Sequence, residues 1–210
     1  SPVLTGGRFV TDPERGPVVE LEGPHDGIWL IRNAATVMSR EGHSDMTIAF
    51  QFKPENVEGR QVLYAQGFHG AGLNIYLDGG TLYAGAWAPA ASMDTTGWYP
   101  VWGRSWPGDW LKFEGIKPGK WYRIAFVVDG ATGEVEPDKH HLYVNGKRVA
   151  SGPGVQIPRQ YGAPRIGRVH MDGKLLTRFH DEEAEVSPFR GRLDDFVLSH
   201  SAMNAGETED

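Results

Sequence analysis

Apolar side chains recur at every second position in many short segments of this chain, the spacing expected of a β-strand with one buried face. Between residues 121 and 128 the alternating apolar side chains are Tyr122, Ile124, Phe126 and Val128. Asn145-Gly146 separates the next two segments and favours a tight hairpin, because a type I′ turn needs positive φ at both central residues. No long segment has a helical apolar stripe. The pattern therefore predicts an all-β fold with at most a short helix or two.

The alternation and the intervening turn residues also place the strands. We expect strands at Val18–Leu21, Ile28–Ile31, Met46–Phe52, Gln61–Gln66, Leu73–Leu77, Thr81–Trp87, Lys112–Phe113, Trp121–Val128, His140–Val144, Lys147–Ala150, Pro164–Gly167 and Gly191–Ser199. Two irregular insertions, residues 88–111 and 168–190, interrupt this order. Residues 1–12 and the acidic tail at 207–210 are expected to be poorly held ends.

Length and composition fit one domain. A chain of 210 residues can form a single β-sandwich, predicted here over residues 1–210 with a core from about 17 to 200. The 28 glycines and 14 prolines supply turns throughout, and the absence of cysteine means that no disulfide supports the fold. Because the chain begins with Ser1-Pro2 and not with Met, we expect a module of a larger protein.

The charge narrows the choice of partners. A net charge of −6 argues against a nucleic-acid partner, which calls for a basic face, and favours calcium over phosphate as a bound ion. No apolar stretch is long enough to cross a membrane, and there is no signal-peptide pattern, so no membrane insertion is expected.

Several motifs occur in a characteristic order. They are MTIAFQFKP at 46–54, KWYRIAFVVDG at 120–130, HLYVNGKRVASG at 141–152 and FRGRLDDFVLS at 189–199, preceded by a strand region at 18–31. In this order they resemble the laminin G-like branch of the concanavalin A-like lectin and glucanase superfamily. The resemblance implies a jelly-roll sandwich of two antiparallel sheets. It also implies a secreted or cell-surface bacterial protein, and the fold hosts lectins, adhesion modules, lyases and hydrolases.

The resemblance further implies a structural calcium ion where the first strands meet the last. The acidic residues at the matching positions are Glu22, Asp26, Asp194 and Asp195. Calcium takes six to eight oxygen ligands in irregular geometry, so one or two acids with several carbonyls suffice. The alternative is that Asp194 or Asp195 accepts backbone N–H groups at a sheet corner. A second, rim calcium site is not expected, because Ala71-Gly72 stand where that site needs an acid.

The first insertion is rich in aromatic side chains. It holds four of the seven tryptophans, together with a tyrosine and an arginine: Trp98, Tyr99, Trp102, Arg104, Trp106 and Trp110. A flat indole ring fits the apolar C–H face of a sugar at small entropic cost. The alternative is that some of these tryptophans pin a long loop onto the sheet.

Strand parity adds four more candidate sugar-binding residues. With Leu73, Ile75, Leu77, Leu82, Ala84 and Ala86 on the core side, the opposite face presents Asn74, Tyr76, Tyr83 and Trp87. These amide, phenol and indole groups can bind hydroxyls and stack on sugar rings. The alternative is that they fill cross-strand pairs on a covered face.

The second insertion has mixed charge, which is typical of a solvated loop. If it faces the binding surface, Arg168, His170 and Arg178 could recognise a uronate or sulfate, because guanidinium groups pair with oxyanions. Arg168 and His170 are therefore added to the candidate carbohydrate-binding residues.

The motifs of catalytic relatives are missing. Glucan hydrolases of this fold resemble one another in an E-x-D-x-E strand, and no such motif occurs here. Gln66-Gly67-Phe68-His69 lacks the Gln-x-His spacing of the alginate lyases. We therefore predict a non-catalytic carbohydrate-binding module that binds a polysaccharide or oligosaccharide. The alternatives are a structural or protein-interaction domain and, third, a polysaccharide lyase or hydrolase.

Overall fold

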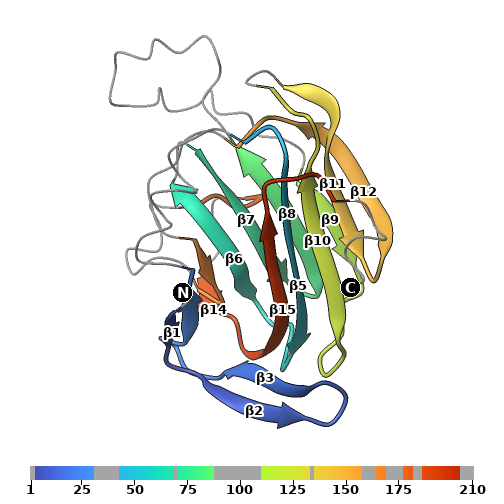
Figure 1. Cartoon of the computed structure of the whole chain (residues 1–210). Helices are drawn as coiled ribbons and strands as arrows, with labels where there is room; N and C mark the ends of the chain where they lie inside the picture. The colour runs from blue at the N-terminus through green and yellow to red at the C-terminus, as the bar shows by residue number, and fades with distance from the viewer. Residues whose placement is uncertain are drawn as a thin grey trace.

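The computed structural model describes residues 3–30, 43–68, 71–87, 110–132, 135–157, 164–168, 177–181 and 186–203. These residues form two β-sheets that lie face to face as a sandwich (Figure 1). No helix occurs in the described ranges, and so none that could span a membrane. The predicted fold, a concanavalin A-like jelly-roll sandwich, is confirmed.

One sheet has eight strands. In spatial order it contains β1 (Val3–Thr5), β4 (Gly27–Trp29), β13 (Arg165–Ile166), β6 (Arg60–Phe68), β7 (Ala71–Asp78), β8 (Thr81–Trp87) and β9 (Leu111–Glu114), with β14 (Val186–Pro188) paired to β6 off this path. All of these pairs are antiparallel except β14 with β6.

The other sheet has seven strands, all antiparallel. In spatial order it contains β12 (Lys147–Gly154), β11 (Glu136–Val144), β10 (Tyr122–Val128), β5 (Met46–Pro54), β15 (Gly191–Ser199), β3 (Gly16–Leu21) and β2 (Arg8–Asp12). The last strand, β15, lies between β5 and β3, with Gly191 opposite both Pro54 and Leu21. An early strand, β3, and the last strand, β15, are therefore neighbours in one sheet (Figure 1).

The core between the sheets consists of the predicted alternating side chains. Tyr122, Ile124, Phe126 and Val128 are buried there, opposite Leu73, Ile75 and Leu77 of β7. At one end, Phe52 stacks on Tyr122 with ring centroids 5.6 Å apart and meets the ring of Phe189 edge-on at 6.1 Å. Burying a large apolar side chain of this kind contributes roughly 1.5–3 kcal/mol, so these rows dominate the stability of the sandwich.

The turn between β11 and β12 also forms as predicted. Asn145 has a φ of 50° and Gly146 a φ of 75°, the positive pair that a type I′ turn requires. The side chain of Asn145 accepts a hydrogen bond from the backbone N–H of Arg123 on β10 (2.9 Å), which ties the turn to the next strand.

The prediction for the N-terminal residues was wrong. Strands β1 and β2 form within the first twelve residues, and the side chain of Asp12 is fully buried. Arg192 on β15 donates to the Asp12 carboxylate (2.6 Å), and the backbone N–H of Glu14 donates as well (2.9 Å). Burial alone would raise the pKa of Asp12, but these hydrogen bonds hold it well below its usual range. A charged network, which alternation does not reveal, holds this end of the chain.

Strand β14 was also missed, because residues 186–188 belong to the second insertion and are too short to show a period. The predicted acidic tail lies outside the described residues.

Candidate functional site

The outward face of β7 and β8 carries the side chains that strand parity placed there. The six predicted core residues of these strands are all buried between the sheets, which confirms the parity. Asn74, Tyr76 and Trp87 point the other way, yet Asn74 and Tyr76 are 0% exposed and Trp87 is 2% exposed. Only Tyr83 is half-buried. The expectation of an open face at all four residues is therefore corrected: this face is largely covered, as in the alternative reading.

Two described parts of the chain cover Tyr76. Phe179, from the second insertion, meets the Tyr76 ring edge-on with centroids 4.9 Å apart, and Trp110 does the same from another side at 5.3 Å. Tyr83 stacks on Tyr76 at 5.2 Å, and Trp87 lies 6.2 Å from Trp110. We call Tyr76, Tyr83, Trp87, Trp110, Phe179 and His180 the aromatic cluster.

Two glycines let the indole rings lie close to the sheet. A Cβ atom at Gly85 would lie 2.8 Å from Cε3 of Trp110, and one at Gly72 would lie 2.5 Å from Cζ2 of Trp87. Neither contact is sterically possible with a side chain present. The absence of a side chain at these positions therefore positions both tryptophans.

His180 links the second insertion to the sheet. Its backbone N–H donates to the Tyr76 hydroxyl (2.7 Å), and its Nδ1 lies 2.7 Å from the same oxygen. The contacts are satisfied when the hydroxyl donates to Nδ1 and the imidazole proton sits on Nε2, which lies 3.1 Å from Asp181 Oδ2. Burial raises the pKa of Tyr76 well above its usual value, so the phenol remains a donor at neutral pH.

Arg60 provides a second link. Its side chain is 1% exposed and donates to Asp78 Oδ2 (2.7 Å) on β7 and to Asp181 Oδ1 (2.8 Å). The guanidinium also lies over the ring of Phe179, 4.7 Å from its centroid. Burial alone would lower the pKa of Arg60, but the two carboxylates raise it, so the charge is retained.

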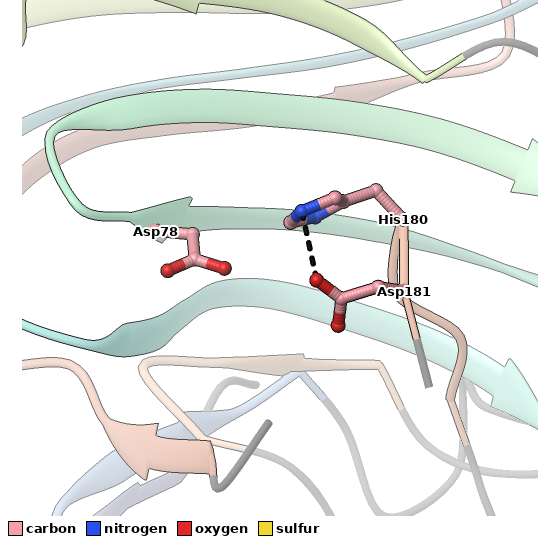
Figure 2. A group of neighbouring side chains, drawn as sticks. All are labelled: Asp78, His180 and Asp181. Carbon is pink, nitrogen blue, oxygen red and sulfur yellow. Dashed lines mark ion pairs between the residues drawn. The ribbon is translucent and has the colours of Figure 1, made fainter. Parts of the chain in front are cut away.

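One group of side chains has the composition of a metal site. Asp78, His180 and Asp181 point toward one another, with one ligand atom of each within 4.8 Å of the others (Figure 2). No other set of three or more such ligands occurs in the ranges that the structure describes. Arg60 donates to both of these carboxylates, so a guanidinium already supplies the positive charge that a metal ion would bring. This group therefore does not fit a resident metal.

The four predicted calcium ligands do not form a common group. Asp26 accepts the backbone N–H groups of Glu22 (2.9 Å) and Gly23 (2.8 Å), and Glu22 pairs with Arg8 (2.9 Å). Asp195, at a positive φ of 47°, accepts a hydrogen bond from Gln51 (2.6 Å).

Its neighbour Asp194 is partly buried; burial raises its pKa, and a hydrogen bond from the backbone N–H of Asp195 opposes this rise. The observed partners of all four side chains are protein groups, so this arrangement does not fit the implied calcium ion.

Most of the remaining predicted sugar-binding residues lie outside the described ranges, and Arg168 lies away from the aromatic cluster. Trp98, Tyr99, Trp102, Arg104, Trp106 and His170 lie outside the described residues. Arg168 is half-buried beside β4, where its guanidinium donates to the carbonyl oxygen of His25 (2.6 Å). Trp87 and Trp110, which flank residues 88–109, both belong to the aromatic cluster, so the Trp-rich insertion begins and ends there.

Sequence reasoning missed Arg60, Phe179 and His180. The mixed charge of the second insertion suggested a solvated loop, but residues 177–181 pack on the sheet. An aromatic residue next to a histidine within a charged segment was the signal available. This signal could indicate that the segment packs on the domain, but it could not identify the strand on which it packs.

Comparison with known proteins gives the family. A family model described as the concanavalin A-like lectin/glucanases superfamily matches residues 32–208. The chain therefore belongs to this superfamily. No curated protein matches its sequence.

Solved structures share the fold at low identity. The CBM40 domain of a Ruminococcus gnavus IT-sialidase, bound to α2,3-sialyllactose, has a TM-score of 0.56 and 15% identity, covering 91% of this chain and 94% of that one. Domain 4 of the arabinanase AbnA from Geobacillus stearothermophilus, in complex with arabinotriose, has a TM-score of 0.58 and 14% identity, covering 99% and 85%. The receptor-binding domain of a botulinum neurotoxin C/D mosaic has a TM-score of 0.62 and 11% identity, and the chain spans 44% of its length.

Proposed function

We propose that this protein is a non-catalytic carbohydrate-binding module whose sugar-binding surface is the accessible edge of the aromatic cluster. One observation carries the proposal. Tyr83 and His180 stack with ring centroids 4.2 Å apart and planes 4° apart, and both reach solvent, as does Trp110. These rings offer flat apolar surfaces next to imidazole and carboxylate groups, the combination that binds C–H faces and hydroxyls of sugars.

The buried members of the cluster have a supporting role in this proposal. Tyr76 and Trp87 hold the exposed rings in place, because rings locked by packing lose little entropy when a ligand binds. The Trp-rich insertion begins and ends at the aromatic cluster. In this proposal its side chains Trp98, Tyr99, Trp102 and Trp106 add to the sugar-binding surface. Two of the structural neighbours hold sugars in their solved structures, sialyllactose and arabinotriose, which is consistent with a sugar-binding role.

A catalytic role has less support. Hydrolysis of a glycosidic bond needs two carboxyl groups on either side of the sugar, one of them able to give a proton. At the cluster, Asp78 and Asp181 both accept hydrogen bonds from Arg60. In this arrangement neither is free to act as a general acid. We propose that the module forms one domain over residues 1–210 and belongs to a longer secreted or cell-surface protein, beside a catalytic or adhesive neighbour. Sugar binding in this proposal needs no calcium.

Affinity electrophoresis tests the proposal. Native gels containing arabinan, xylan, β-glucan or polygalacturonate should retard the protein in at least one case, with a Kd on the order of 1 μM to 1 mM, typical of a few stacking contacts. Tyr83→Ala should abolish the retardation. Tyr143→Ala is the matched control, because Tyr143 is also half-buried but lies on β11 of the other sheet. Unretarded wild-type protein in every gel of a broad glycan panel would contradict the proposal.

A second candidate function is contact with another protein domain, the alternative derived from the sequence. Phe9 on β2 is 74% exposed and stands at a largely apolar cavity of about 170 Å³ that Phe50, Ile166 and Phe196 also line. An exposed aromatic ring of this kind is common in protein interfaces. Sedimentation velocity tests whether the protein associates with itself. If no glycan binds, and if Phe9→Ser abolishes an association that the wild-type protein shows, the protein-contact function is favoured.

A further inference from the structure

Three buried polar atoms without a hydrogen-bond partner lie on the outward face of the eight-stranded sheet: Trp29 Nε1, Arg165 Nη1 and Asn74 Oδ1. Over the described part of the chain two other such atoms occur, Thr177 Oγ1 and Gln51 Oε1, the latter on the other sheet. Buried polar groups are normally paired, and an unpaired one destabilises the folded state. A cluster of unpaired groups on one face therefore requires an explanation.

The three residues lie on one row across the sheet. Arg165 of β13 is directly opposite Trp29 of β4 on one side and Ala65 of β6 on the other, and Ala65 is opposite Asn74 of β7. Residues directly opposite one another share a face, so Trp29, Arg165 and Asn74 all point outward. Neighbouring strands are about 4.8 Å apart, which places the backbones of Arg165 and Asn74 roughly 10 Å apart with only a methyl group between them. Ala65 is partly exposed, so the row is not fully covered at that point.

Arg165 is the unusual member of this row. It is 4% exposed, its guanidinium lies 4.3 Å from the centroid of the Trp29 ring, and no carboxylate pairs with it among the described residues. The other buried arginine of the described residues, Arg60, is paired with two aspartates, and the half-buried Arg192 is paired with Asp12 and Glu20. Burial lowers the pKa of Arg165, and the charge of Arg168 lowers it further.

Stability alone does not explain this arginine. The cation–π contact with Trp29 is favourable, but it is smaller than the desolvation cost of a buried charge without a counter-ion. A methionine at this position would fill similar volume at no electrostatic cost. A planar fork of N–H donors is, in contrast, the group that best matches a carboxylate.

We propose that Arg165, Trp29 and Asn74 form a subsite for the carboxylate of an acidic sugar. Arg165 donates to the carboxylate, the indole N–H of Trp29 donates to the same group, and Asn74 Oδ1 accepts a hydroxyl of that sugar. The Nδ2 group of Asn74 is held by the carbonyl oxygen of Arg178 (2.9 Å), which leaves Oδ1 as the acceptor. Trp29 is half-buried, so the row is reached from its β4 end.

The subsite rests on the proposed function and sharpens it. Asn74 lies on β7 next to β8, the strands of the aromatic cluster, so one chain of sugars could contact both. The cluster would bind the apolar faces, and the Arg165 subsite would select for charge.

The test compares acidic and neutral forms of the same sugar by isothermal titration calorimetry. The two pairs are oligogalacturonate with its methyl ester, and sialyllactose with lactose. We expect wild-type protein to bind at least one acid about tenfold more tightly than its neutral partner. Arg165→Met should reduce the affinity for that acid to the level of the neutral partner without lowering the melting temperature, and Arg165→Lys should lose most of the preference. Arg148→Met, an exposed arginine on β12, is the matched control and should change nothing.

Two results would overturn the subsite. One is wild-type protein that binds the acid and the neutral partner equally in both pairs; the proposed function then stands and only the charge selection fails. The other is Arg165→Met protein with unchanged affinity for the acid. If Arg165→Met fails to fold, Trp29→Phe decides, because it keeps the ring but removes the N–H donor and should weaken acid binding alone. Protein that binds no glycan at all, neutral or acidic, removes the proposed function and this subsite with it.

Discussion

The imidazole of His180 lies parallel to the ring of Tyr83, 4.2 Å away, although the two residues come from distant parts of the chain. The same imidazole shares a 2.7 Å contact with the hydroxyl of Tyr76 on the neighbouring strand. Residues 177–181 therefore pack on the outward face of the eight-stranded sheet. The stacked rings of His180 and Tyr83 form the accessible aromatic edge of that face.

His180→Ala should lower the stability of the protein. It removes one hydrogen-bond partner of the buried Tyr76 hydroxyl, a loss of about 1–2 kcal/mol, and a domain of this size loses roughly 2–4 °C of melting temperature per kcal/mol. Differential scanning calorimetry measures the shift. His25→Ala is the control, because His25 is exposed and accepts the hydrogen bond from Arg168 through its backbone oxygen. An unchanged melting temperature for His180→Ala would show that residues 177–181 add nothing to the stability of the sheet.

Gly85→Ala should disturb Trp110. The new methyl group would lie 2.8 Å from the indole, and such overpacking typically costs 1–3 kcal/mol. We expect a lower melting temperature together with weaker glycan retention, since Trp110 has to move. Gly152→Ala is the control: its methyl group would meet only the flexible end of Leu111 at 3.0 Å, and its effect should be smaller. Equal effects of the two variants on glycan retention would contradict a positioning role for Gly85.

His140 should make the fold sensitive to acid. It is 1% exposed, and burial lowers its pKa from 6.5 to about 4, while Nε2 lies 3.0 Å from the carbonyl oxygen of Val155. The folded state therefore favours the neutral ring, and the unfolded state binds the proton first as the pH falls. Stability is fully present above about pH 6.5 and decreases as the pH falls toward 4, by about 3 kcal/mol in total.

Urea unfolding at pH 7.5, 6, 5 and 4 measures this dependence. Carboxylates also titrate near the lower end, so the comparison with His140→Leu isolates the histidine. The variant should lose the part of the slope between pH 6.5 and 5, whereas His25→Ala should keep it. A slope in this range that is the same in wild-type and His140→Leu protein would show that His140 titrates normally.

Melting temperature should not depend on calcium. Glu22, Asp26 and Asp195 already have protein partners, and an ion that binds only the folded state at a hundredfold excess over its Kd would add about 2.7 kcal/mol. We therefore expect equal melting curves in EDTA and in millimolar calcium. Asp26→Asn should lower the melting temperature equally in both. Burial alone would raise the pKa of Asp26, but hydrogen bonds from backbone N–H groups hold it below its usual value, and these bonds do not involve calcium. A rise of several degrees in calcium, abolished by Asp194→Ala, would restore the calcium ion that the family resemblance implied.

The sequence by itself determined the two-sheet sandwich. Alternation fixes which side of a strand faces the core, because successive side chains point to opposite faces, and it placed Leu73, Ile75 and Leu77 correctly. The hairpin at Asn145-Gly146 is equally local, since the positive φ angles depend on those two residues alone. These features need no knowledge of what packs against the strand.

Only the tertiary structure decided what covers the outward face. Tyr76 and His180 are 104 positions apart, and Arg60 and Asp181 are 121 apart; no period in the sequence encodes such contacts. The same holds for Arg165, which alternation places on an outward face but whose missing counter-ion becomes visible only when its neighbours are known. Parity is a property of one strand, whereas burial and charge pairing are properties of whatever the rest of the chain brings to it.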